Sequence, residues 1–252
     1  MTAKDIVLGA VRQLFGDRDV SAVDRWVASD FRQHGSLAAD GPEGLRQLMR
    51  TVPAGVRYEL HRVIADGDLV ALHGTFHGFR ATPLVAFDVF RVADGKLAEH
   101  WDALGPVVEN TVSGRSQTDG PTEITDLRAT AANRALVTAF VDDVLRGGKV
   151  DTITDYVSTE QYWQHNPGVG DGLDGFATAF GALAAQGIGL VYDTVHRVIA
   201  EGNFVLTVAE GRFGTTPTAF YDLFRVENGK IVEHWDVTPE IVTDLPHGNG
   251  QF

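Results

Sequence analysis

The chain has 252 residues, of which 44% are hydrophobic and 22% charged, a balance typical of soluble globular domains. Its net charge of −13 leaves no basic surface for phosphates, so we expect no nucleic-acid partner. Cysteine is absent, which excludes disulfides and cysteine nucleophiles, and no apolar run suits a signal peptide or a membrane span, so we expect a cytoplasmic protein without a membrane partner.

Apolar residues at helical spacing come first in the chain, and alternation with a period of two follows. The first pattern predicts helices over residues 4–15, 19–27 and 42–49, with a short strand at 30–34. The second predicts antiparallel strands over residues 58–65, 69–79, 84–92 and 97–104. Helices followed by a run of strands predict an α+β domain with its helices on one face of a bent sheet.

The same series of motifs then occurs a second time. Glu-His-Trp-Asp at 99–102 returns unchanged at 233–236, and the tight turn Asp94-Gly95 returns as Asn228-Gly229. Two copies of about 120 residues are too long and too few for a solenoid. The sequence therefore predicts a duplicated domain, with repeat 1 at residues 1–110, a linker at 111–127 and repeat 2 at 128–246.

Alternation along a strand decides which side chains of the repeated motif share a face. His234 and Asp236 should lie on one face, roughly 6.5–7 Å apart, while Trp235 faces the other way. The same argument pairs His100 with Asp102 in repeat 1. A histidine and a carboxylate on one side of a sheet are candidate proton-transfer groups. A solvent-exposed edge strand would give the same pattern, but its recurrence in both halves favours a functional interpretation.

Two further carboxylates, Asp88 and Asp222, lie in the middle of predicted strands with apolar neighbours. A carboxylate in such surroundings is costly unless it has a partner. An ion pair with the arginine three residues later is disfavoured, because residues three apart on a strand point to opposite faces. We therefore expect both carboxylates to face a cavity.

Three motifs of repeat 2 resemble those of the SnoaL-like polyketide cyclases: Gln-His-Asn-Pro at 164–167, Asp-x-Phe-Arg-Val at 222–226 and Glu-His-Trp-Asp at 233–236. These cyclases are a branch of the nuclear-transport-factor-2-like superfamily, which also holds ketosteroid isomerase and limonene epoxide hydrolase. The resemblance implies two tandem cone-shaped α+β-barrel domains that pair as an internal pseudo-dimer, with a monomer expected in solution. A small-molecule ligand or substrate is the expected partner.

The resemblance also implies a set of site residues in each repeat. The expected acid–base residues are Asp236, His234 and His165 in repeat 2, and Asp102, His100 and His34 in repeat 1. The residues expected to shape the pockets are Asp222, Tyr221, Trp163 and Asn166 in repeat 2, and Asp88 and His73 in repeat 1. An aspartate at the bottom of an apolar cone would act as the base, because lost solvation raises its pKa.

Two differences between the repeats bear on this site. Repeat 2 has Asn166 and Pro167 after His165, where repeat 1 has glycine and serine. We therefore expect repeat 2 to contribute more of the activity. His73 and His77 share strand parity and could form a histidine cluster with His34 and His100, but repeat 2 has valine and arginine at the positions of His73 and His77. We therefore expect no metal and no cofactor.

The leading interpretation is cofactor-independent general acid–base chemistry on a small, fairly apolar carbonyl compound, by isomerisation, cyclisation or aldol-type carbon–carbon bond formation. Two alternatives stay open. In the first, Asp222 and Asp236 activate a water that opens a strained ring, as the resemblance to an epoxide hydrolase implies. In the second, the cavity binds a small molecule without chemistry.

Overall fold

The computed structural model describes residues 1–252, which fold as two compact units. Domain 1 consists of residues 1–107 together with 241–252, and domain 2 consists of residues 108–240. The segment 111–127, which we expected to be a linker, is therefore part of domain 2. Residues 241–252, which follow the last strand of repeat 2 in the chain, are part of domain 1.

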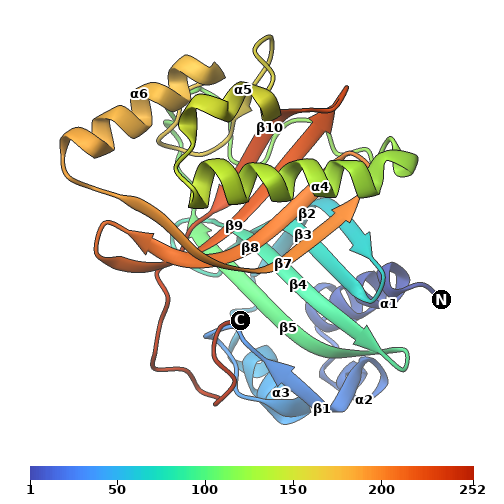
Figure 1. The fold of residues 1–252 in the computed structure, drawn as a ribbon. Helices are drawn as coiled ribbons and strands as arrows, with labels where there is room; N and C mark the ends of the chain where they lie inside the picture. The colour runs from blue at the N-terminus through green and yellow to red at the C-terminus, as the bar shows by residue number, and fades with distance from the viewer. The chain divides into compact units, whose positions relative to one another are not determined.

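Domain 1 is a five-stranded sheet with helices packed against it (Figure 1). The helices are α1 (Ala3–Val11), which continues as a π-helical turn over Arg12–Gly16, α2 (Val23–Trp26) after a 3₁₀ turn at Val20–Ala22, and α3 (Gly41–Thr51). The strands are β1 (Val27–Gln33), β2 (Arg57–Asp66), β3 (Leu69–His77), β4 (Leu84–Ala93) and β5 (Lys96–Pro106). Their order in the sheet is β1-β5-β4-β3-β2, with β1 parallel to β5 and the other pairs antiparallel.

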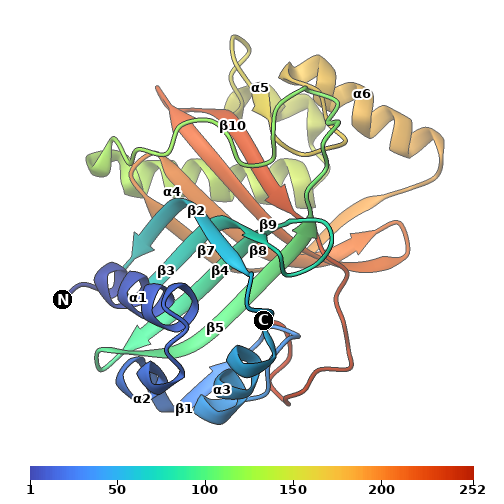
Figure 2. The ribbon, with the colours of Figure 1, turned by 180° about the vertical axis from the view of Figure 1, so that it is seen from behind.

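Domain 2 repeats this topology. The helices are α4 (Thr130–Phe140), preceded by a 3₁₀ turn at Leu127–Ala129 and continued by a π-helical turn at Val141–Arg146, α5 (Ile153–Tyr156) after a 3₁₀ turn at Val150–Thr152, and α6 (Gly172–Ala185). The strands are β6 (Trp163–Gln164), β7 (Leu190–Glu201), β8 (Phe204–Phe213), β9 (Thr216–Glu227) and β10 (Lys230–Val237), in the order β6-β10-β9-β8-β7. Figure 2 shows the same sheets from behind. The predicted duplication of an α+β domain is confirmed.

Local sequence accounts for the element boundaries. Thr2 caps α1 by accepting a hydrogen bond from the Asp5 amide, while the Asp5 carboxylate accepts one from the Thr2 amide. Asp94 and Gly95 have φ angles of 49° and 76°, so the turn between β4 and β5 has the two left-handed residues that a tight hairpin needs. Most strand boundaries differ from the prediction by one or two residues, whereas β1 begins at Val27, three residues before the expected start.

The core of each domain lies between the helices and one face of the sheet. In domain 1 it joins Val7 and Leu14 of the first helix to Val70 and Leu72 of β3. In domain 2 it joins Val137 and Phe140 to the residues of β8 and β9. No helix of the chain is long and apolar enough to cross a lipid bilayer. A cavity lies between the helices and the sheet in each domain.

Candidate active site

Two carboxylates and a histidine come together in domain 2. Asp222 on β9 stands directly across the sheet from Asp236 on β10, and His234 is two residues before Asp236 on the same face. His234 Nε2 lies 3.1 Å from Asp222 Oδ1. The charged or ligating atoms of the three side chains all lie within 4.8 Å of one another. All three residues are less than a tenth exposed, which makes their charges strongly interdependent.

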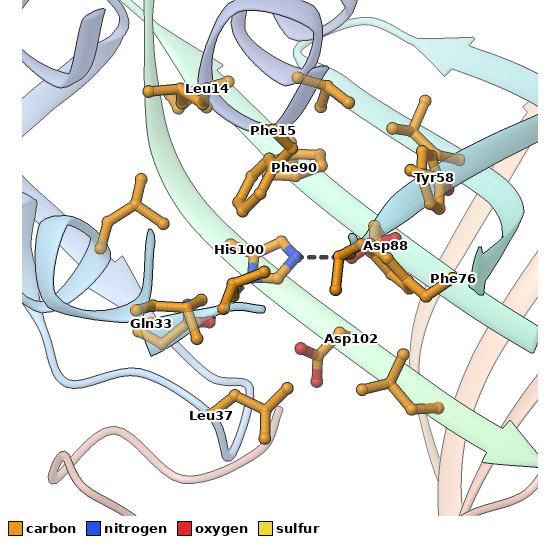
Figure 3. Close-up of a pocket in the computed structure, with 18 of the residues that line it drawn as sticks. Leu14, Phe15, Gln33, Leu37, Tyr58, Phe76, Asp88, Phe90, His100 and Asp102 are labelled. Atoms are coloured by element: carbon orange, nitrogen blue, oxygen red, sulfur yellow. Dashed lines mark hydrogen bonds and ion pairs between the residues drawn. The ribbon is translucent and has the colours of Figure 1, made fainter. Parts of the chain in front are cut away.

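Domain 1 contains the same arrangement, which Figure 3 shows in close-up. Asp88 on β4 stands across from Asp102 on β5, and His100 Nε2 lies 3.1 Å from Asp88 Oδ1. The sequence predicted these shared faces correctly, because alternation along β5 and β10 alone determines them.

A glutamine fixes the orientation of each histidine. In domain 1, Gln33 Oε1 accepts hydrogen bonds from the backbone amides of His34, at 3.0 Å, and Gly35, at 2.8 Å. An atom that accepts from two amides is an oxygen, so His100 Nδ1, 2.9 Å away, must donate a proton to it. His100 therefore presents Nε2 to Asp88.

In domain 2, His234 Nδ1 lies 3.0 Å from Gln164 Oε1 in the same way. Burial lowers the pKa of His234, but the hydrogen bond to Asp222 and the charges of Asp236 and Asp222 raise it by more, so the net shift is upward. The pKa of His100 is raised for the same reasons, with Asp88 as its hydrogen-bond partner. Each histidine thus lies between an amide oxygen and a carboxylate, two neighbours that favour its protonated form.

The second carboxylate of each set is the one with spare proton-accepting capacity. Burial raises the pKa of Asp236, with a further upward contribution from Asp222, while His234 and the hydrogen bond from Asn166 oppose the rise. Asn166 Nδ2 donates to Asp236 Oδ2 at 2.6 Å. The pKa of this carboxyl is therefore moved toward the range in which a general base works near neutral pH.

Asp102 has no equivalent amide, because Gly35 stands at the position of Asn166. A Cβ atom at residue 35 would lie 2.4 Å from Asp102 Oδ2, so the backbone of Gly35 runs directly against this carboxylate. Burial raises the pKa of Asp102 to about 6, helped by Asp88 and opposed by His100 and His247. The two aspartates thus occupy equivalent places with different neighbours.

A tyrosine completes the domain 2 site. Tyr192 on β7 is buried, and its hydroxyl donates to Asp222 Oδ2 at 3.1 Å. Burial, the charges of Asp222 and Asp236 and this hydrogen bond raise its pKa well above the ordinary value. Tyr192 and Gln164 are site residues that we did not expect from the sequence. The signal that could have found them is repetition, since Tyr58 and Gln33 hold the same places in repeat 1.

The site of domain 2 opens into a cavity of about 320 Å³. Asp222, His234, Asp236 and Asn166 are on its wall, and the rest is mainly apolar: Phe140, Leu145, Phe176, Phe180, Leu183, Leu190, Phe213, Phe220 and Phe224. Ligand pockets commonly start at about 300 Å³, so this cavity has room for a small organic molecule. The corresponding cavity of domain 1, lined by Asp88, His100 and Asp102, is only about 80 Å³.

The expectation that His165 enters the cavity is wrong. Its ring stacks on Trp235, with centroids 4.6 Å apart, and its Nε2 lies 2.8 Å from Glu233 Oε1 on the opposite face of the sheet. The reason is alternation: Gln164 and Asn166 point into the cavity, so the residue between them points away.

His34 follows the same rule in domain 1. Its ring stacks on Trp101 with centroids 4.7 Å apart, and its Nδ1 lies 3.0 Å from the carbonyl oxygen of Gly250. It is not on the wall of the cavity, in contrast to our expectation. Both histidines instead join the sheet to a segment that covers its back.

Three expected pocket residues also lie elsewhere. Tyr221 is buried on the face of β9 opposite to Asp222. Trp163 packs against the Arg115 guanidinium, 4.4 Å from its ring centroid, outside the cavity. His73 stacks on Phe87 behind the domain 1 sheet, so it forms no cluster with His34, His77 and His100.

Each Asp–His–Asp set has ligand atoms close enough together to surround a cation. To bind it, His234 would have to give up the Nε2 proton that it directs at Asp222. The raised pKa of the imidazole opposes that loss. We therefore interpret these sets as proton-transfer groups and assign no metal ligands.

Comparison with known proteins agrees with this architecture. The sequence profile of the SnoaL-like domain matches the chain twice, over residues 9–100 and 137–234. A search of curated proteins gave no match. Among solved structures, TsrD from Streptomyces laurentii is 20% identical, with 40% of this chain and 87% of TsrD covered and a TM-score of 0.35.

Two other solved structures are similar to the same extent. A SnoaL-like polyketide cyclase from Agrobacterium tumefaciens is 16% identical, with 42% of this chain and 92% of that protein covered and a TM-score of 0.36. A nuclear-transport-factor-2-like protein from Mesorhizobium loti is 16% identical, with 41% and 90% covered and a TM-score of 0.37. The family assignment rests on the two profile matches, which together span more than half of the chain. This chain belongs to the SnoaL-like domain family and contains two copies of that domain.

Proposed function

We propose that domain 2 performs cofactor-independent general acid–base chemistry on a small, fairly apolar carbonyl compound. The reactions that suit this site are isomerisation, cyclisation and aldol-type carbon–carbon bond formation, all of which begin by removing a proton next to a carbonyl group. The observation that carries the proposal is a raised-pKa carboxylate, Asp236, beside a buried imidazolium, His234, at the wall of an apolar cavity of about 320 Å³.

Asp236 is the base in this scheme. Its carboxylate takes the proton from the carbon next to the carbonyl group, and the electron pair moves onto the carbonyl oxygen as an enolate. The protonated carboxyl then returns the proton to another atom of the same substrate. In an aldol-type reaction the enolate carbon instead attacks a second carbonyl carbon, whose π electrons move onto its oxygen, and the carboxyl gives its proton to the alkoxide that results. Asn166 keeps the carboxylate oriented through its hydrogen bond to Oδ2.

The enolate charge is stabilised by His234 and Tyr192. Both donate to Asp222 in the structure, so a substrate oxygen placed between them would share protons that are already oriented. Because the site is buried and mainly apolar, the positive charge of the imidazolium acts at low dielectric. His165, which the resemblance suggested for this task, lies on the other face of the sheet and is not assigned a part in the reaction.

Water activation by two carboxylates is the less favoured scheme. Asp222 already accepts hydrogen bonds from His234 and Tyr192, which leaves Asp236 as the single carboxylate free to bind a water. A binding protein without chemistry would need an apolar cavity with one or two polar anchors. The buried Asp–His–Asp set exceeds that need and costs stability, so we favour the enzyme.

The proposal can be tested without knowing the natural substrate. The full chain would be incubated in D₂O with a panel of cyclic ketones and β-diketones that fit the cavity, and loss of the α-proton signal would be followed by NMR. We expect exchange above the buffer rate with the native protein and the buffer rate with Asp236→Asn. Asp222→Asn should also lower the rate, because the imidazolium loses its carboxylate.

A parallel panel of small epoxides in ¹⁸O-labelled water tests the hydrolytic scheme. Diol formation with no ketone exchange would replace the proposal by water activation. Ligand-induced chemical shift changes in domain 2 with no turnover on either panel would indicate a binding protein and contradict the proposal.

A further inference from the structure

The C-terminal segment of the chain is bound to the site of domain 1. Asn249 Nδ2 donates to the carbonyl oxygen of Gln33 at 2.9 Å and to Asp40 Oδ1 at 2.7 Å. His247 Nε2 lies 3.0 Å from the carbonyl oxygen of Gly35. With the bond between His34 Nδ1 and the Gly250 carbonyl, three contacts therefore hold the consecutive residues 33–35, and a fourth holds Asp40.

Domain 2 has the same cover, but from a different part of the chain. Ser113 Oγ donates to the carbonyl oxygen of Gln164 at 2.7 Å, and His165 Nδ1 donates to the Ser116 carbonyl oxygen at 2.6 Å. Arg115 Nε binds the Asp171 carboxylate at 2.9 Å. In each domain the segment engages the glutamine carbonyl, the histidine Nδ1 and the aspartate that starts the following helix. The segment after the last strand of one repeat thus covers the domain of the other.

The residues that the C-terminal segment holds are those that orient His100. Gln33 Oε1 accepts a hydrogen bond from His100 Nδ1. The same oxygen also accepts hydrogen bonds from the backbone amides of His34 and Gly35. A shift of residues 33–35 would therefore move the acceptor that holds the imidazolium in place. Asn249 sets the position of that acceptor through the backbone of Gln33.

His247 adds a second effect, on Asp102. Gly35, to which it is bonded, lies directly against the Asp102 carboxylate. His247 Nδ1 is buried and makes no hydrogen bond. Burial and Asp88 raise the pKa of Asp102, and His100 and His247 oppose that rise. Domain 1 lacks the asparagine amide of domain 2, and a histidine from the far end of the chain is near the same carboxylate.

We propose that residues 247–250 belong to the functional site of domain 1. Asn249 positions Gln33, and His247 is the positioning residue for Asp102. His247 thereby takes the place of the amide that Asn166 supplies to Asp236 in domain 2. The inference concerns the geometry of domain 1 and stands apart from the reaction proposed for domain 2. The domain 1 site is then built from both ends of the chain, and domain 2 provides an internal control in every experiment.

The test uses NMR of the full chain with ¹⁵N-labelled histidine, in which His100 and His234 are observed together. A chain ending at Glu240 keeps the contacts of Pro239 and Glu240 with β9 in domain 2. We expect exchange of the His100 Nδ1 proton with solvent to accelerate about tenfold or more in this variant, with His234 unchanged. Asn249→Ala should reproduce part of the effect without removing the segment.

His247 is tested by two substitutions that keep a donor for the Gly35 carbonyl. His247→Gln removes the charge, and His247→Lys retains it. With ¹³C-labelled aspartate, the titration midpoint of Asp102 should move upward in His247→Gln and stay near the native value in His247→Lys, while Asp236 titrates as before in both. A purely structural part for His247 would move neither midpoint.

The proposal is overturned if His100 and Asp102 keep their native exchange rate and titration in the point variants and in the truncated chain. It is also overturned if the signals of His234 and Asp236 change as much as those of domain 1, because the effect would then be general. The matched variant Ser113→Ala should give the mirror result, with a change at His234 and none at His100.

Discussion

The two domains share topology, strand register and an Asp–His–Asp set, yet their cavities differ fourfold in volume, about 320 Å³ in domain 2 against about 80 Å³ in domain 1. One position explains much of this difference. Phe76 lies across from Leu84 in domain 1, and its ring centroid is 4.5 Å from that of Tyr58. The matching register position in domain 2 is Gly211, across from Thr218.

Glycine at 211 has a local cause. A Cβ atom there would lie 1.8 Å from the carbonyl oxygen of Val191, next to the irregularity in the pairing of β7 with β8 between Tyr192 and Thr194. Residue 211 therefore has no room for a side chain, and no aromatic ring enters the domain 2 cavity from this position. The two copies therefore kept the Asp–His–Asp set and diverged in the apolar residues that decide whether a ligand fits.

The largest expected effect comes from removing the proposed base. Asp236→Asn should lower turnover about 10²–10⁴-fold, the usual cost of losing a general base. Asp102→Asn should lower it much less, because the cavity of domain 1 has little room for a substrate. The ketone exchange assay measures both. Equal losses of turnover would show that the two sites are equivalent. A larger loss from Asp102→Asn would show that domain 1 is the more active domain.

The second prediction concerns stability and pH. Because the pKa of Asp102 is raised from 3.8 to about 6 on folding, its contribution to stability is fully present below pH 3.8 and is lost as the pH rises through about 6. Asparagine at position 102 cannot ionise, so the Asp102→Asn variant should not lose this stability. Between pH 4 and pH 8 its free energy of unfolding should rise by on the order of 1–3 kcal/mol relative to that of the native chain.

Denaturant unfolding of the two proteins at several pH values checks this. The control is a surface variant such as Asp126→Asn, which should follow the native pH dependence. A stability difference between Asp102→Asn and the native chain that does not change with pH would contradict the account of the domain 1 carboxylate.

Opening the smaller cavity should make the two domains more alike. Phe76→Ala removes the ring that packs on Tyr58, and we expect domain 1 to bind a ligand that fits domain 2, with affinity improved about tenfold over native domain 1. Chemical shift changes at His100 and Asp102 report this binding. If ligand still failed to perturb these residues, volume would not be the reason for the difference.

The smallest expected effect is on the pH profile of domain 2. Asn166→Gly removes the hydrogen bond that lowers the pKa of Asp236 and gives domain 2 the glycine of domain 1. The pKa of Asp236 should rise further, so the acidic limb of the rate profile should move to higher pH, since the base must be ionised to act. An acidic limb that stays in place or moves to lower pH would show that Asn166 does not tune this carboxylate.

The sequence alone predicted the parts of this structure that depend on local pattern. Alternation placed His234 and Asp236 on one face and Trp235 on the other, and the Asp94-Gly95 and Asn228-Gly229 turns determined the register of the hairpins. The carboxylates Asp88 and Asp222 were placed in cavities from their apolar neighbours, and the structure puts them there.

What could not be predicted depends on short segments and distant contacts. β6 has only two residues, too few for alternation to show which way His165 points, and we followed the resemblance instead. The bond between Asn249 and Gln33 joins residues 216 positions apart, which no local pattern reveals. The pairing of the two domains as an internal pseudo-dimer stays a prediction.

The central claim is that domain 2 holds the cavity that receives a ligand, and a binding stoichiometry tests it most directly. A ligand found in the ketone panel would be titrated calorimetrically into the native chain and into Ala179→Trp, which places an indole in the domain 2 cavity. We predict one equivalent bound per native chain and none bound by Ala179→Trp. Two equivalents in the native chain, or one that persists in Ala179→Trp, would contradict the claim.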